Sequence, residues 1–469
     1  MKKIITSASL AALGAISLQA GTPLDRSYYA PNPVLTPVQS SKWWSVSATL
    51  RGFYDDNYNT SPHRTVVSTL DPATGLVTTS EIKKQDSFGF EISPAFGINI
   101  PLPQTYIGFN YQYSLRYYED RSSPKDDQSH QADLRITHSV NENFKVDIKD
   151  SFVVSQEPSV LDDKSITTPV LRRSNSDATR NHGTIDFQYQ LSPRFSLAFG
   201  YENSIYDYWK AGPGSYSALL DRMEHLGKID FRWHLQPDTI ALIGYQYQVV
   251  DHNSSDTLVL GVPFIPGGPT DPETRDSKSH YIFVGGDKTF SNHLFASVRL
   301  GAQFTQYPDA VVIDGPTVFD YHRDSDDNVN PYADASLTYT YAEGSFAQLG
   351  IRHARNQTDL AFVPGSFSTS IQDQASTTLY GVVTHRITPK ITANLVGQVQ
   401  RSEFGGTQDT GETDMFYLIG LNFAYQINQF LSTELGYNYD RLDSDVVYAD
   451  GNSRSFTRNR VYIGIKASY

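Results

Sequence analysis

The sequence predicts an all-β fold: a transmembrane, antiparallel, up-and-down β-barrel of about 18 strands. Three observations predict it. Apolar and polar residues alternate repeatedly from residue 42 to residue 469, which is the period of a strand with two different faces. Tight polar turns alternate with longer polar stretches, as in barrels with short periplasmic turns and longer extracellular loops. Mean hydropathy is −0.40 despite 30 Tyr and 25 Phe, which fits a wall where only alternate residues meet lipid.

The region before the barrel divides into two segments. Residues 1–20 have a basic start at Lys2 and Lys3, an apolar run over residues 4–18 and small residues at Ala20 and Gly21, which predicts a signal peptide cut after Ala20. An N-terminal membrane anchor is the alternative, but the run is short for a span of about 20 residues. Residues 21–41 contain four prolines and predict an extended periplasmic tail. The barrel is expected over residues 42–469.

Turns and loops give the strand count. The tight turns lie near residues 101–104, 141–143, 192–194, 236–238, 291–293, 342–344, 388–390 and 428–429. The longer stretches lie near residues 57–85, 119–129, 156–178, 209–221, 253–277, 307–328, 358–374, 403–413 and 443–456. Together they connect 18 strands. The alternation of apolar and polar residues is mixed over residues 276–290, and residues 55–85 could contain a further hairpin, so barrels of about 16 or 20 strands are alternatives. A soluble β-sandwich or β-helix is a further alternative.

Alternation also predicts which side chains face the lumen. Leu294, Ala296, Val298 and Leu300 share one face of a strand, and Ser297 and Arg299 share the other. In a lipid barrel the apolar set faces out and the polar set faces in. By this parity the predicted pore-lining residues are Arg51, Glu91, Arg116, Arg135, Lys145, Asp147, Lys149, Asp186, Lys228, Asp230, Arg232, Arg299, Asp334, Arg352, Arg386, Glu434, Arg458 and Arg460.

Such a set of inward charges has two interpretations. Ionisable groups at membrane depth must face water or one another, so the lumen is either a water-filled pore or a salt-bridged interior. About 18 strands enclose a lumen too wide for side chains alone to fill, which favours an aqueous channel. Opposed charges across a constriction would then select solutes by charge. The alternative is structural pairing along the wall.

Aromatic residues near strand ends predict girdles at headgroup depth. These residues are Trp43, Trp44, Tyr54, Tyr58, Tyr117, Tyr118, Tyr206, Tyr208, Trp209 and Tyr439. A sugar-binding aromatic track is the alternative, because Tyr118, Tyr380, Phe416 and Tyr462 have lumen parity, although they are scattered in the sequence.

The last predicted strand ends in an aromatic residue. Apolar residues occupy every second position before it, and they share one face: Val461, Ile463, Ile465, Ala467 and Tyr469. This arrangement resembles the signal read by the barrel-assembly machinery of Gram-negative bacteria, and we expect that machinery as a partner.

Several function classes are disfavoured. The net charge is −13, which disfavours nucleic acid as a partner. No phosphate-binding Gly loop, HExxH or GxSxG occurs, so we expect no enzyme, cofactor or metal. A catalytic pair at Asp251 and His252, with Asp256 nearby, is the alternative to a solvated surface pair. Acidic positions at residues 126–127, 162–163, 324–327 and 440–450 could bridge lipopolysaccharide through divalent cations, or simply form a solvated acidic surface.

Two turn-strand units carry a resemblance to a family. Ser192-Pro193-Arg194-Phe195-Ser196-Leu197 and Thr388-Pro389-Lys390-Ile391-Thr392-Ala393 each open an outward strand. With these units the chain resembles the bacterial outer-membrane proteins of the putative β-barrel porin 2 family. The resemblance implies location in the cell outer membrane, in contact with its lipid, and supplies no catalytic motif.

Three hypotheses follow for function. The first is a passive diffusion channel for small hydrophilic solutes. The second is an outer-membrane component of exopolysaccharide export or assembly, since similar barrels occur in exopolysaccharide loci. The third is an outer-membrane hydrolase or a surface-binding barrel. A homo-oligomer such as a trimer is left open.

Overall fold

The fold comes from a computed structural model of the chain. It describes residues 43–62, 64–70, 77–156, 177–212, 216–258, 264–314, 317, 319–323, 325–358, 360, 371–405, 411–446 and 454–469. The predicted signal peptide and Pro-rich tail, residues 1–41, lie outside the described residues.

Eighteen strands form one sheet. They are β1 (Trp44–Asp55), β4 (Ser87–Pro101), β5 (Thr105–Tyr118), β6 (Asp126–Asn141), β7 (Phe144–Ser155), β8 (Ala178–Ser192), β9 (Phe195–Tyr208), β10 (Arg222–Gln236), β11 (Thr239–His252), β12 (Ser277–Ser291), β13 (Leu294–Tyr307), β16 (Asp326–Ala342), β17 (Ser345–Gln357), β18 (Asp373–Thr388), β19 (Ile391–Gly405), β20 (Thr413–Gln426), β21 (Leu431–Ser444) and β22 (Phe456–Ser468).

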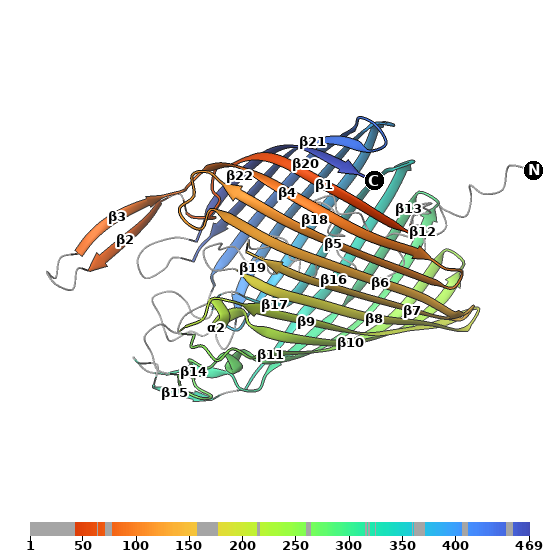
Figure 1. The fold of residues 1–469 in the computed structure, drawn as a ribbon. Helices are drawn as coiled ribbons and strands as arrows, with labels where there is room; N and C mark the ends of the chain where they lie inside the picture. The colour runs from red at the N-terminus through yellow and green to blue at the C-terminus, as the bar shows by residue number, and fades with distance from the viewer. Residues whose placement is uncertain are drawn as a thin grey trace, which may run out of the picture.

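The sheet closes on itself because β1 pairs with a strand on each side. Leu50 stands opposite Ile92 of β4 and opposite Ile465 of β22, and both pairings are antiparallel. The other strands pair with their neighbours in chain order, which Figure 1 shows as a tilted cylinder. Closure removes the free edge of the sheet. This matters in lipid, because an unpaired backbone group there costs about 2–7 kcal/mol. The predicted 18-stranded antiparallel barrel is confirmed.

The two ends of the barrel differ as predicted. Eight tight turns join strands at one end, where Tyr469 also exchanges backbone hydrogen bonds with Val46 near the start of β1. The other end carries the longer connections and their small elements: the hairpin β2 (Arg64–Leu70) and β3 (Val77–Lys83), α2 (Tyr216–Leu220), η3 (Pro272–Arg275), and the pair β14 (Val311–Ile313) and β15 (Tyr321–Arg323).

These elements settle the alternative strand counts. The hairpin suspected within residues 55–85 exists, but its strands pair only with each other among the described residues. Of the segment of mixed parity, residues 277–290 belong to the single strand β12. In the part of the chain that the structure describes, no helix combines the length and apolarity that crossing a membrane requires.

The outer face of the wall is apolar, as its alternation predicted. Along β13, Val298, Leu300 and Phe304 are exposed on the outside, whereas Arg299 and Gln303 are buried on the inside. The same parity holds in β22, where Val461, Ile463 and Ile465 are exposed. Burial of such residues in hydrocarbon holds the barrel in the bilayer, with lipid in place of a soluble protein's core.

The ladder between β16 and β17 is incomplete. β16 pairs with β13 from Tyr339 opposite Leu294 to its outer end, where Asp326 stands opposite Tyr307. With β17, however, β16 pairs only from Ala333 to Ala342, so among the described residues its outer seven positions lack a partner on that side. Pro331 marks the break, because proline has no backbone N–H to donate to a ladder.

Beyond the break, the outer end of β17 lies inside the wall. The Gln303 side chain of β13 points inward, and its Oε1 accepts from the Arg355 N–H at 2.8 Å while its Nε2 donates to the Arg355 carbonyl at 3.1 Å. Gln357 reaches Ser277 of β12, and inward-pointing Tyr307 donates to Asp373 of β18. The outer ends of β17 and β18 therefore pack against the inner face of β12 and β13.

Candidate functional site

The inner wall carries the predicted charges. Arg299 is 4% exposed between Val298 and Leu300, and Leu300 is 54% exposed. The other predicted residues also have inward parity and are buried or partly buried, except Arg386, which is exposed. The structure sorts them into separate groups along the wall rather than one ring.

The first group joins the beginning and the end of the chain. Glu91 of β4 binds Arg51 at 3.1 Å and Arg116 of β5 at 2.9 Å. Arg51 Nε also donates to Glu434 of β21 at 2.5 Å. These four side chains bridge four strands on both sides of β22, and three of them are buried. Each buried charge therefore has an opposite charge in contact.

A second group lies nearer the loop end, on β1 and β22. Asp55 at the end of β1 accepts from Arg458 at 2.6 Å and from Arg460 at 2.7 Å. Asp55 is fully buried, and the sequence analysis missed it. Its parity with Arg51, four residues earlier, was the available signal, because residues at even spacing in a strand share a face.

A third group occupies β6 and β7. Asp147 contacts Arg135 at 3.2 Å and Lys149 at 3.4 Å, and it accepts from the Thr137 hydroxyl at 2.6 Å. Lys145 lies two residues before Asp147 on the same face and is partly buried. This group contains more positive than negative side chains, and Lys149 keeps 30% of its side chain exposed.

The fourth group spans β8 to β13. Lys228 contacts Asp186 at 2.9 Å and Glu202 at 3.0 Å. Asp287 of β12 binds Arg299 at 2.8 Å, and the same carboxylate lies 4.0 Å from Arg232, which is also 4.0 Å from Asp230. Glu202 and Asp287 were not among the predicted residues, although each has the inward parity of its strand.

The three remaining predicted residues belong to none of the ion pairs described above. Asp334 and Arg352 stand opposite each other on β16 and β17, and Asp334 also stands opposite Arg299. Arg386 lies near a tight turn and donates to the Pro389 carbonyl at 3.4 Å. The structure therefore places Arg386 at the mouth on the tight-turn side, away from the middle of the wall.

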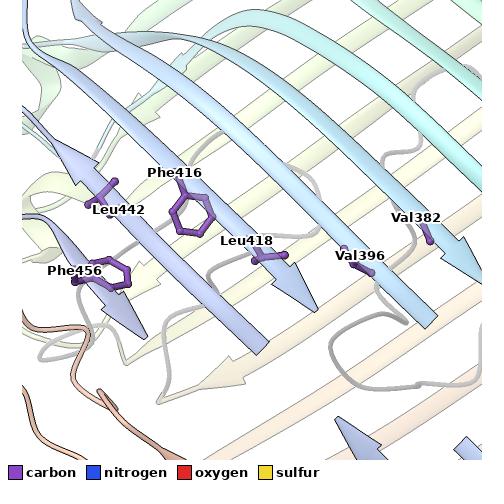
Figure 2. Close-up of a cluster of buried hydrophobic side chains, with 6 residues drawn as sticks. All are labelled: Val382, Val396, Phe416, Leu418, Leu442 and Phe456. Atoms are coloured by element: carbon purple, nitrogen blue, oxygen red, sulfur yellow. The ribbon is translucent and has the colours of Figure 1, made fainter. Parts of the chain in front are cut away.

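Part of the inner wall is apolar, contrary to the expected polar lumen. Figure 2 shows six buried side chains on the inward face of β18–β22: Val382, Val396, Phe416, Leu418, Leu442 and Phe456. Val382 stands opposite Val396, and Phe416 stands opposite Leu442. Sequence parity already gave Phe416 an inward direction, but it did not predict that five neighbouring strands share an apolar interior cluster.

Four of the predicted girdle residues lie inside the barrel instead. Tyr58 and Tyr118 pack with Phe53 and Tyr462 in one buried cluster. Tyr206 and Tyr208 pack with Ala178 and Leu220 in another. By the alternation along their strands, Tyr118, Tyr206 and Tyr208 point inward. A position near a strand end was therefore not sufficient to predict a girdle residue.

Other predicted girdle residues do lie on the outside. Trp43, Trp44 and Trp209 are exposed. The four aromatic residues of lumen parity are all buried, but Phe416 belongs to a different cluster from Tyr118 and Tyr462, so they do not form one track.

The catalytic pair considered from the sequence, Asp251 with His252, does not form. His252 is buried, and its Nδ1 lies 3.5 Å from Asp276, whereas Asp251 is exposed. Asp256 instead accepts from the Ser217 hydroxyl. Among the described residues, no group of three or more His, Cys, Asp or Glu side chains is arranged to hold a metal ion.

Two of the acidic positions at the loop end are already engaged. Arg121 binds Asp127 at 2.7 Å, and Asp440 is buried on the inner face of β21. Neither carboxylate belongs to an open acidic surface, so both interpretations made for these positions were wrong there. Residues 162–163, 324 and 447–450 lie outside the described residues.

Several solved structures match the chain at low sequence identity and with low TM-scores. OccAB4 of Acinetobacter baumannii matches with 12% identity, 93% of this chain and 100% of that chain covered, and a TM-score of 0.40. OpdK of Pseudomonas aeruginosa matches with 9% identity, 91% and 99% covered, and a TM-score of 0.42. OmpT, an outer membrane protein of Vibrio cholerae, matches with 12% identity, 79% and 99% covered, and a TM-score of 0.37.

No curated protein matches the chain in sequence. The family comparison is more informative, because residues 327–469 match the family described as Putative beta-barrel porin 2. That segment runs from β16 through the closing strand β22. The chain is therefore a porin-like β-barrel of the outer membrane, in contact with membrane lipid, and its residues 327–469 match the model of the Putative beta-barrel porin 2 family.

Proposed function

We propose that the barrel is a passive diffusion channel for small hydrophilic solutes. One observation carries the proposal: charged side chains on the inner wall of β5–β10 keep part of their surface open. The exposed fractions are 30% for Lys149, 26% for Lys228 and 19% for Arg116. An ionisable group at membrane depth is tolerated only beside water or an opposite charge, so open charged surface favours water in the lumen.

The charged groups also favour a selective channel. Asp147 and Asp186 are more enclosed than the lysines that contact them. Glu202 beside Lys228 is 29% exposed, so the water-facing charge is mainly positive only on β6 and β7, although the whole chain is acidic. A positive wall attracts anionic solutes into the lumen and slows cations, as rings of Arg and Lys do in anion pores.

Conductance in planar bilayers tests the proposal. The purified barrel is expected to give steady, ohmic single-channel steps without any partner protein. A reconstituted barrel that stays closed until export proteins are added would replace it with the export hypothesis. A barrel without conductance, but with a hydrolytic activity that His252→Ala abolishes, would replace it with the enzyme hypothesis.

We also propose that the last strand is read by the barrel-assembly machinery. Tyr469 and the apolar residues before it at every second position point outward and are exposed in the folded chain. Tyr469→Ala is expected to lower the amount of folded barrel in the outer membrane, measured by heat-modifiable mobility of cell extracts. Tyr437→Ala, on the outer face of β21, is the matched control. Equal folded amounts in both variants would contradict this role.

A further inference from the structure

A polar recess lies on the inner wall, where β17 leaves the ladder. Its lining comes from the inward faces of β10–β13 and from the tucked end of β17, including Glu224, Gln248, Ser279, Thr305 and Asn356. Its enclosed volume is about 40 Å³. A site for one water needs roughly 10–15 Å³, so the recess admits a few hydroxyl-sized groups, which is one edge of a hydroxylated molecule.

Uncharged hydrogen-bonding groups dominate this lining. The hydroxyls of Ser279 and Thr305 lie 2.8 Å apart. Tyr281 beneath them donates to Gln248 at 2.8 Å and accepts from Gln303 at 3.0 Å. Each hydroxyl has one donor and two acceptor positions, so such a surface can exchange hydrogen bonds with hydroxyls of a solute.

The charges of the recess are balanced within it. Arg222 contacts Glu224 at 2.7 Å, and its guanidinium lies over the Tyr206 ring at 3.9 Å. Arg355 contacts Asp373 at 2.7 Å. Two cations and two carboxylates leave no net charge, so the recess offers little attraction to an ion that loses its hydration on entry.

The lining is held in place before any solute arrives. Gln303 exchanges two hydrogen bonds with the backbone of Arg355, and Gln357 donates to Ser277 at 3.2 Å. These contacts fix the end of β17 against β12 and β13. A preorganised site loses less conformational entropy when a solute binds, so even a solute that makes few contacts can bind in competition with water.

We propose that this recess is a binding subsite for an uncharged hydroxylated molecule, such as a free sugar or one residue of a polysaccharide. The binding itself does not depend on the diffusion function. Only the statement that the recess lies on the path of the solute rests on the proposed function.

Binding by the detergent-purified barrel tests the subsite without any channel measurement. D-Glucose, the uncharged probe, is expected to show saturable binding in equilibrium dialysis, and gluconate, its anionic counterpart, to bind at least about tenfold more weakly. Thr305→Val keeps the shape and removes one hydroxyl, and we expect it to weaken glucose binding about 3- to 10-fold, as for one lost hydrogen bond. Ser376→Ala, which removes an inner-wall hydroxyl paired with Ser402 outside this recess, is the matched control.

Further measurements separate the outcomes. Asn356→Ala, at the rim, gives a second variant should Thr305→Val fail to fold, and it is expected to weaken binding likewise. Dextran binding at least as tight per site as glucose assigns the subsite to a polysaccharide, and weaker dextran binding assigns it to free sugars. Absence of saturable glucose binding, or equal binding of glucose and gluconate, overturns the subsite. Steady conductance in that same preparation would leave the diffusion channel standing.

Discussion

At the scale of single residues, the inner wall depends on charges that share partners. Glu91 holds both Arg51 and Arg116, and Asp55 holds both Arg458 and Arg460. Removing one member leaves a buried charge with less compensation, and breaking a buried ion pair destabilises a protein by about 3–5 kcal/mol. Exposed pairs contribute about 0–1 kcal/mol, because water already solvates both partners.

Arg51→Ala tests this difference. We expect the free energy of unfolding in urea, measured with the barrel in lipid vesicles, to fall by about 3–5 kcal/mol. Arg401→Ala is the control, since Arg401 forms an exposed pair with Glu403 on β19, and its loss is expected to stay within about 1 kcal/mol. Similar losses in the two variants would show that the inner network does not stabilise the closed barrel.

Two carboxyls in the outer connections give a pH dependence. Burial raises the pKa of Asp221 to about 7 and the pKa of Asp276 to about 7. An unfolded Asp loses its proton near pH 3.9, so between about pH 4 and pH 7 the folded chain binds more protons than the unfolded chain. The contribution of these groups to the free energy of unfolding therefore falls as pH rises through this range.

The double variant Asp221→Asn with Asp276→Asn removes that contribution. Its melting temperature, followed by circular dichroism, is expected to gain relative to the parent chain as pH rises from about 4.5 to 7.5. The Asn side chains can still accept from the Tyr208 and His252 N–H groups that contact the two carboxylates. A constant difference in melting temperature across this range would contradict the assignment of raised pKa values.

At the scale of elements, the split between β16 and β17 is the main departure from a regular barrel. If the ladder continued in register, Pro331 would stand opposite Arg355, and proline cannot donate there. Gln303 takes over both backbone groups of Arg355. A side chain of β13 thus replaces a strand as the partner of β17.

Gln303→Ala removes this replacement. We expect the Arg355 amide to exchange its hydrogen at least about tenfold faster, because a fixed acceptor is lost and local opening becomes easier. Gln398→Ala, another buried inward glutamine, on β19, is the control and is expected to leave that amide unchanged. Unchanged protection of Arg355 in Gln303→Ala would mean that other contacts hold the strand.

The sequence predicted the barrel strands well, because parity and turn residues are local properties. It did not predict the split, although a local signal exists. The outward positions of β17 change from Leu349 and Ile351 to His353 and Arg355 toward the loop end, so the strand loses its lipid-facing character before it ends. Pro331 adds a second signal on β16. Both signals predict a split only when the neighbouring strand is known, and the sequence of one strand does not show its neighbour.

At the scale of the whole molecule, the sequence predicted the direction of the charged side chains but not their partners. Arg51 and Glu434 are 383 residues apart and meet only because the sheet closes. The apolar cluster of β18–β22 was missed because one or two inward apolar residues per strand are inconspicuous until five strands align. The resulting inner wall is uneven: open charged groups on β5–β10, a polar recess beside β17, and an apolar face on β18–β22.

The central claim is that the inner wall of β5–β10 lines a water-filled path. The most direct test is the reversal potential of single channels in a KCl gradient. The double variant Lys149→Glu with Lys228→Glu is expected to shift selectivity toward cations, because the open positive charge becomes negative. Arg401→Glu, an outward-facing reversal on β19, is expected to cause no shift. An unchanged reversal potential in the double variant, with the barrel folded and conducting, would contradict the claim that these side chains line the path.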